Sequence, residues 1–296
     1  MESLLSLAFD NLSSFDGSKI KKGLKQVEGL LAQICLSGPR SPRKPSVARG
    51  RDQEQAFRKG LSDLSGDPAF REFFKLQEGF EWNIAQRLLT TLDWLVVRGG
   101  DGQYDLLIVN ALDLIQGVLL LHPPSKALFA RSVHMNLLLD LLEPINCPAI
   151  QSATIITLVV ALLDMPQNVR VFEQLDGLLT VTSLFKSRET GREVKFRLTE
   201  FLYFYLTPET PSITRAAEAR SGPAALLQPS PSKLAKVLAG GGNGGNNKNG
   251  EAQGHESDAT LSVEEKKLLV DRYLPGVVDE LLKDLDTYKP FGGVLS

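Results

Sequence analysis

Three segments of the chain share one spacing of proline, phenylalanine and a turn-type position, and this repeat constrains the fold more than any other feature. In each copy a phenylalanine follows a proline by six residues, and the turn-type position follows five residues later, before an apolar run. The copies are Pro68–Phe74–Gly79, Pro123–Phe129–His134 and Pro166–Phe172–Gly177. The second and third copies lie 43 residues apart, and the first and second lie 55 apart. We attribute the additional 12 residues to the loop RGGDGQ, residues 98–103, and its flanking turns.

The same shift of 43 residues relates apolar positions of the neighbouring helical segments. The related triplets are Leu112/Ile155/Leu198, Ile115/Leu158/Phe201 and Leu119/Leu162/Tyr205. A period in the low forties with two or three helices is typical of armadillo and HEAT repeats, whose units bury their apolar faces against each other. The sequence therefore predicts an all-α fold, an armadillo/HEAT-like right-handed helical solenoid with a C-terminal capping helix. A non-repeating helical bundle with coincidental spacing is the alternative.

Composition changes divide the chain into five parts. We expect N-terminal helices at 1–36, a basic Pro-rich loop at 37–55, an armadillo-like helical core at 56–206, a disordered Gly/Pro/Asn-rich linker at 207–260, and a C-terminal helix with a PFGG tail at 261–296. The linker has 13 Gly and Pro in 54 residues and no aromatic residue, so it cannot bury enough apolar area to offset its ordering entropy. In the last part, Ser262 and Glu265 form a predicted capping box, and Pro275 is expected to kink or split the helix.

The charge and the scarcity of reactive side chains exclude several classes of protein. Lys and Arg total 33 against 35 Asp and Glu, so nucleic-acid binding is not expected. Two Cys and three His indicate a reducing compartment and disfavour metal and thiol chemistry. Neither Cys35 nor Cys147 begins the C-x5-R loop of a phosphatase, and the Gly-rich run lacks the G-K-[S/T] of a P-loop. We expect no catalysis, no cofactor, no signal peptide and no membrane insertion; an unrecognised enzyme remains an alternative.

A solenoid binds partners along one helix from each unit, here the predicted helices 104–121, 150–163 and 192–206. Basic residues gather on and beside the last of these helices, followed by a tyrosine. The candidate partner-binding residues are Lys186, Arg188, Arg192, Lys195, Arg197 and Tyr203. The basic cluster either serves solubility or docks an acidic helix, from a partner or from this chain's own tail at Glu264, Glu265, Asp279 and Glu280. Trp82 and Trp94 are expected in the core; an exposed one would be a candidate anchor.

Two serines that precede proline are candidate phosphorylation sites. Ser41 begins Ser-Pro-Arg-Lys, the pattern that proline-directed cell-cycle kinases prefer, within a stretch of seven basic and two acidic residues from Arg40 to Lys59. Ser230 also precedes a proline, in the linker. A phosphate at Ser41 would partly cancel the local positive charge.

Two segments resemble the fungal cell division control protein fourteen family, the septation initiation network component and not the phosphatase of that name. They are FEQLDGLLTVTSLFKSRETGREVKFRLTEFLYFYLTPE at 172–209 and EEKKLLVDRYLPGVVDELLKDLDTYKPFGG at 264–293. The resemblance implies a non-catalytic regulatory subunit that pairs with a germinal-centre-type protein kinase of the sterile-twenty class. It also implies work in the cytoplasm, at the spindle pole body and at the division site during cytokinesis. An armadillo-type cargo or targeting adaptor is the alternative.

Overall fold

The computed structural model describes residues 1–36, 64–100, 102–209 and 260–288. These residues form helices and loops with no strand among them, so the predicted all-α class is confirmed. The helices are α1 (Glu2–Leu12), α2 (Gly17–Leu36), α4 (Pro68–Glu78), α5 (Ile84–Arg98), α6 (Asp105–Leu121), η1 (Pro123–Ala130), α7 (Ser132–Asp140), α8 (Pro148–Leu162), α9 (Pro166–Gln174), α10 (Gly177–Lys186), α11 (Arg192–Tyr205), α14 (Val263–Asp271) and α15 (Val278–Tyr288).

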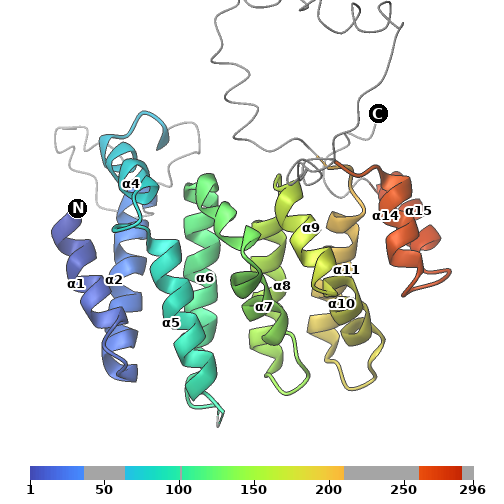
Figure 1. Cartoon of the computed structure of the whole chain (residues 1–296), viewed down its shortest axis with the longest axis horizontal. Helices are drawn as coiled ribbons and strands as arrows, with labels where there is room; N and C mark the ends of the chain where they lie inside the picture. Colours follow the sequence, from blue (N-terminus) through green and yellow to red (C-terminus); the bar gives the residue numbers. More distant parts are fainter. Residues whose placement is uncertain (37–63, 101, 210–259, 289–296) are drawn as a thin grey trace, which may run out of the picture.

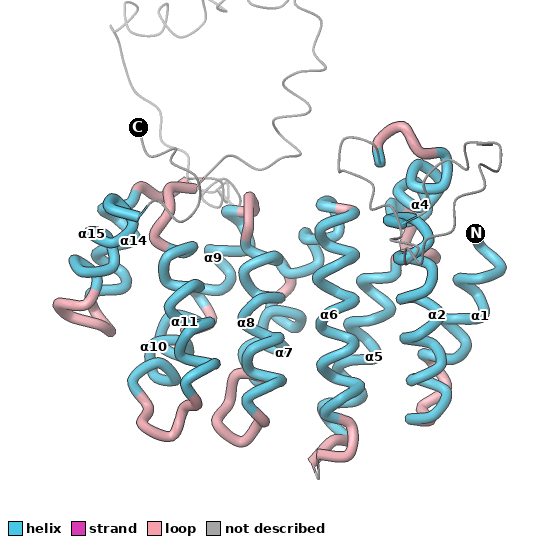
Figure 2. The backbone as a smooth tube through the Cα atoms, turned by 180° about the vertical axis from the view of Figure 1, so that it is seen from behind, coloured by secondary structure: helices cyan, strands magenta, loops and turns pink. Residues whose placement is uncertain are grey.

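The helices form a row of two-sided layers along the long axis of the molecule (Figure 1). On one side of the row α6 packs between α2 and α8, and α8 packs between α6 and α11. Figure 2 shows the molecule from behind, so that this side of the row is nearer the viewer; α1, α5, α7 and α10 form the other side of the row. The N-terminal helices belong to the row, because α1 contacts α5 and α2 contacts α6.

The amphipathic pattern of α2 explains how the chain begins the row. Its buried side chains are those with helical spacing, from Ile20 through Val27 to Ile34. Its lysines at 19, 21, 22 and 25 are exposed. Asp16 supports the start of the helix, since its carboxylate accepts a hydrogen bond from the Lys19 amide at 2.9 Å.

Each copy of the repeat begins with its proline at the first turn of a helix, where the missing N–H costs nothing. Phe129 and Phe172 are fully buried, as the spacing implies. In the first copy the register is shifted by one residue: Phe73 is fully buried, and the predicted Phe74 is only half-buried.

The extra length of the first copy does not come mainly from the loop after Arg98, as the sequence suggested. Its helices are longer: α5 has 15 residues, whereas α7 has 9 and α10 has 10. The nine repeat-related positions from Leu112 to Tyr205 are all buried, with at most 1% of each side chain exposed. The period therefore marks one inward-facing stripe of α6, α8 and α11.

The C-terminal segment is split into α14 and α15 around Pro275, as predicted. The Ser262 hydroxyl accepts from the Glu265 amide, and the Glu265 carboxylate accepts from the Ser262 amide, so the predicted capping box is present. Gly276 has a φ of +81°, which lets the chain turn between the two helices. α15 then packs on α11, and its residues Val278, Leu281 and Leu285 are buried in the core.

Several predictions lie outside the described residues. They concern the basic loop at 37–55, most of the linker, Ser41, Ser230, and the PFGG motif. In the described part of the chain no single helix is long and apolar enough to cross a membrane, and α6 with η1 meets that test only as a pair bent by 120°.

Candidate partner-binding surface

The structure divides the six predicted partner-binding residues into two groups. Lys186, Arg197 and Tyr203 already have partners within the chain. The Arg197 guanidinium lies 2.9 Å from Glu200 and 3.4 Å from Glu193, on its own helix. Lys186 Nζ donates to the Tyr273 carbonyl at 3.2 Å, and the Tyr203 hydroxyl contacts the Asp284 carboxylate at 3.1 Å.

The remaining three, Arg188, Arg192 and Lys195, have no ion-pair partner among the described residues. Arg188 and Arg192 are exposed, and Lys195 is half-buried. Beside them Phe196 is 56% exposed, an unusual position for a large aromatic side chain. The sequence contains enough information to predict this exposure, because Phe196 is out of register with Leu198, Phe201 and Tyr205, the inward-facing positions of the same helix.

The repeat also relates a row of outward-facing positions, which we call the repeat stripe. Its members recur every seven residues along each helix and every 43 residues between helices. They are Leu106, Asp113 and Leu120 on α6, Ala149, Ile156 and Leu163 at α8, and Arg192 and Thr199 on α11. These eight are exposed or half-buried, and Leu106 and Leu120 are more than half exposed, whereas the ninth position of the pattern, Leu206 at the end of α11, is buried. The stripe is therefore mainly apolar over α6 and α8, apart from the exposed Asp113, and carries Arg192 where it reaches α11.

A buried ionic cluster joins the last layer to the C-terminal segment. The Glu209 carboxylate pairs with Arg170 of α9 and lies 3.4 Å from the Lys266 ammonium of α14. It also accepts from the Leu261 amide at 2.9 Å. Lys266 Nζ donates to the Thr207 carbonyl at 2.9 Å and lies 5.0 Å from the centre of the Tyr205 ring.

Burial shifts the titration of this cluster. It lowers the pKa of Lys266, although Glu209 acts against that shift, and it raises the pKa of Glu173, although the Tyr205 hydroxyl and Arg170 act against it. The same desolvation, with the nearby Glu173 charge, raises the pKa of the Tyr205 hydroxyl. Charged side chains are costly to bury unless they are paired. Because Lys266 of the tail finds its partner in Glu209 beside the last layer, the pairing favours one position of the tail.

The structure contradicts the alternative in which the tail docks on the basic cluster through Glu264, Glu265, Asp279 and Glu280. Glu265 caps its own helix, Asp279 pairs with Lys267 of the tail, and Glu264 and Glu280 are exposed. In the buried pair between core and tail, the acid is Glu209 of the core and the base is Lys266 of the tail. The net charges of the two segments could not reveal this, because a buried pair depends on which single residues face each other.

The histidines and cysteines occupy structural positions. Burial lowers the pKa of His122 to about 4, and its Nδ1 lies 2.8 Å from the Ser125 hydroxyl. His134 Nδ1 lies 2.8 Å from the Leu128 carbonyl, within α7 and not at a turn. Cys35 and Cys147 are both half-buried, and His255 lies outside the described residues. Within the described ranges no group of three His, Cys, Asp or Glu side chains could hold a metal ion.

Comparison with known proteins places the chain in a family. The family described as Cell division control protein 14, SIN component, matches residues 1–291. The chain belongs to this family. The Cell division control protein 14 of Schizosaccharomyces pombe (strain 972 / ATCC 24843) is 31% identical over 222 residues, which cover 72% of this chain and 82% of that protein. No solved structure matches.

Membership of the Cell division control protein 14, SIN component, family supports a role in septation initiation. The family is the septation network component and not the phosphatase, in agreement with the missing C-x5-R loop after Cys35 and Cys147.

Proposed function

We propose that this protein is a non-catalytic regulatory subunit that binds and supports a germinal-centre-type protein kinase of the sterile-twenty class in septation initiation. Family membership supports the process, and the repeat stripe supports the mode of action. We assign the row of helices to the armadillo-like solenoids, because buried and exposed positions both recur with the 43-residue period. In this assignment α14 and α15 are the cap of the last unit.

The observation that carries the proposal is the continuity of the repeat stripe with the basic residues of α11. Leu106 and Leu120 offer apolar area, and Phe196 offers an exposed aromatic anchor beside Arg192 and Lys195. Large aromatic and arginine side chains dominate the binding energy of many interfaces. A kinase segment with an apolar face and acidic residues at one end would complement this surface.

Binding would regulate the kinase by preferring one of its states. A partner shifts an equilibrium only by the difference between its affinities for the two conformations, so the subunit would bind the active form more tightly. We propose that the complex acts in the cytoplasm, at the spindle pole body and at the division site. Phosphorylation at Ser41 or Ser230 would add charge outside the described helices.

Co-purification tests the proposal. The full chain, tagged and expressed at its native level, should recover a sterile-twenty-class kinase in stoichiometric amount, as quantified by mass spectrometry. The double variant Arg192→Glu/Lys195→Glu and the single variant Phe196→Ala should each reduce recovery about tenfold or more. Arg131→Glu is the matched control, because Arg131 is exposed at the start of α7, away from the stripe.

Two results would contradict the proposal. Recovery of transport cargo without a kinase would favour the cargo-adaptor alternative. Kinase recovery that is unchanged in both the Arg192→Glu/Lys195→Glu and the Phe196→Ala variants would contradict the assignment of the kinase to this surface. Fluorescent tagging should place the protein at the spindle pole body in dividing cells.

A further inference from the structure

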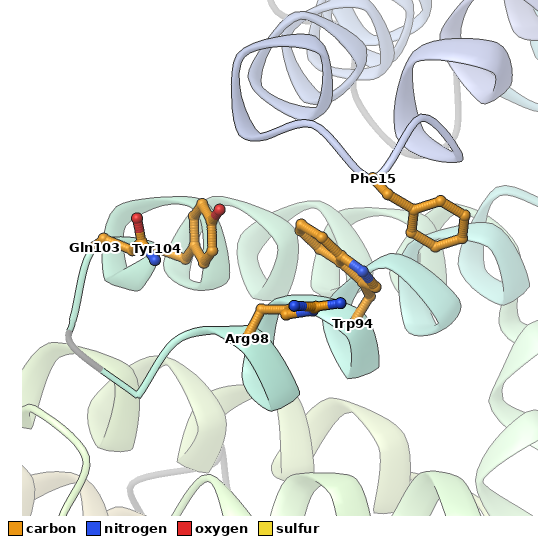
Figure 3. Close-up of a pocket in the computed structure, with 5 residues that line it drawn as sticks. All are labelled: Phe15, Trp94, Arg98, Gln103 and Tyr104. Atoms are coloured by element: carbon orange, nitrogen blue, oxygen red, sulfur yellow. The ribbon is translucent and has the colours of Figure 1, made fainter.

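An open cavity lies at one edge of the row, where the loop between α1 and α2 meets the ends of α5 and α6 (Figure 3). Its volume is about 670 Å³, and its lining residues are Phe15, Trp94, Arg98, Gln103 and Tyr104. It lies apart from the basic residues of α11, at the opposite end of the row (Figure 1).

Three aromatic rings from three elements line this cavity in a row. The Phe15 and Trp94 ring centres are 5.8 Å apart, and the Trp94 and Tyr104 ring centres are 5.7 Å apart. Trp94 and Tyr104 are half-buried: Trp94 packs against the core, as the sequence predicted, and part of its ring remains open to the cavity. Figure 3 shows the Tyr104, Trp94 and Phe15 rings one after another, with Phe15 reaching them from the loop of the neighbouring helical layer.

The backbone of Phe15 and the packing of Tyr104 hold two of these rings in fixed positions. Phe15 has a φ of +54° and is 67% exposed, so a bulky side chain is kept in the left-handed region while its ring faces solvent. Such conformations are costly and concentrate at ligand-binding sites. Tyr104 packs on Gly17, where an added Cβ would lie 2.9 Å from the ring.

Arg98 provides the charge. It is exposed one turn after Trp94 on the same face of α5, and it is the one charged side chain that lines the cavity. The described residues include no acid within ion-pair distance of its guanidinium. The Gln103 amide, also exposed, can donate to and accept from a peptide backbone.

The charges around the cavity favour a carboxylate over a phosphate. A phosphate site usually adds the free amides of a helix N-terminus. Here Asp16 accepts the Lys19 amide at the start of α2, and Asp105 occupies the first turn of α6. Both nearby helix N-termini therefore carry negative charge already, and a single arginine suits a single carboxylate.

We propose that this cavity binds a short segment of a partner protein in which an apolar side chain stands next to an acidic one. The apolar side chain packs against the cavity-facing sides of Phe15, Trp94 and Tyr104, whose rings already contact one another, and the acidic side chain pairs with Arg98. The site is independent of the kinase-binding surface, so either proposal can fail alone.

Selection from a random-peptide phage library tests the proposal. The full chain should enrich peptides with an Asp or Glu adjacent to an aromatic, Leu or Pro residue. Trp94→Ala and Arg98→Glu should each weaken binding of a synthetic consensus peptide about tenfold or more. Selection on the Arg98→Glu variant should change the acidic position to Lys or Arg. Phe80→Ala and Arg131→Glu are matched controls with exposed side chains, and their binding should equal that of the wild type.

A second measurement does not depend on loss of function. The chain has two tryptophans, so Trp82→Phe leaves Trp94 as the single tryptophan, whose emission can be excited apart from that of the tyrosines. The consensus peptide should change its emission in a saturable manner. Circular dichroism and urea midpoints establish that each variant is folded.

Four outcomes would overturn the proposal. They are a selection without the acidic and apolar consensus, peptide binding that survives both substitutions, binding that requires a phosphorylated residue at the acidic position, and a wild-type dimer that Trp94→Ala converts to a monomer.

Discussion

Gly177 shows how a single residue determines the packing of a repeat unit. A Cβ added at this position would lie 2.2 Å from the Phe172 ring, which is fully buried and contacts Phe201 and Tyr205. The ring therefore occupies the space that any side chain at 177 would need. The sequence placed a turn residue here, but only the packing shows that it must be glycine.

We expect Gly177→Ala to lower the free energy of unfolding by about 1–3 kcal/mol, because the Phe172 ring would have to move within a packed core. Urea denaturation measures the change. Gly29→Ala is the matched control: nothing lies within 4 Å of its added Cβ, and alanine favours the helix, so stability should be equal or up to about 1 kcal/mol higher. Equal effects of the two substitutions would contradict the packing argument.

His122 should make the protein sensitive to acid. Burial lowers its pKa to about 4, whereas an unfolded chain protonates histidine near pH 6.5. Between these values the unfolded state binds a proton that the folded state does not, so stability falls as the pH falls from 6.5 to 4. The loss from this residue is up to about 3 kcal/mol, and it levels off below pH 4.

His122→Asn should remove this part of the acid-induced loss while an amide can still contact Ser125. The difference between the unfolding free energies at pH 7 and pH 4.5 would be smaller in the variant than in the wild type. An unchanged pH dependence in His122→Asn would show that other groups cause the acid sensitivity.

At the scale of elements, the C-terminal helices show which features local sequence can determine. The capping box of Ser262 and the break at Pro275 are local, so both were predictable. The docking of the tail was predicted in outline but with the wrong charges, because Glu209 and Lys266 are 57 residues apart in the chain and meet only in the fold.

Lys266→Ala should loosen the tail by about 2 kcal/mol, since Glu209 would lose one of two cationic partners in a buried site. Hydrogen exchange of α14 and α15 measures the local opening. Lys267→Ala is the adjacent control: its pair with Asp279 is exposed to solvent, so its loss should leave the protection of α14 and α15 close to that of the wild type. Equal protection in both variants would mean that the ionic cluster does not hold the tail.

At the scale of the whole molecule, stability should vary along the row. α8 packs on neighbours at both sides, whereas α1 and α15 lie at the ends (Figure 1). In stacked repeats each unit contacts only its neighbours, so the end helices open more easily. We expect the slowest amide exchange in α8, intermediate exchange in α15, and the fastest in the segments that join the helices. Tail amides that exchange at the rate of an unstructured peptide would contradict the docked position of α15.

The helical class, the period and the inward-facing positions were determined by the sequence alone, because apolar side chains at helical spacing must be buried whatever their neighbours are. Only the tertiary structure determines which exposed side chains lie next to each other and which of them have partners within the chain. In the fold Arg197 forms ion pairs on its own helix, whereas Arg192 does not, and Lys186 and Tyr203 form hydrogen bonds with the tail. The fold also brings Phe15 into contact with Trp94, which contacts Tyr104. These arrangements depend on contacts between residues far apart in the chain, and periodicity carries no information about such pairs.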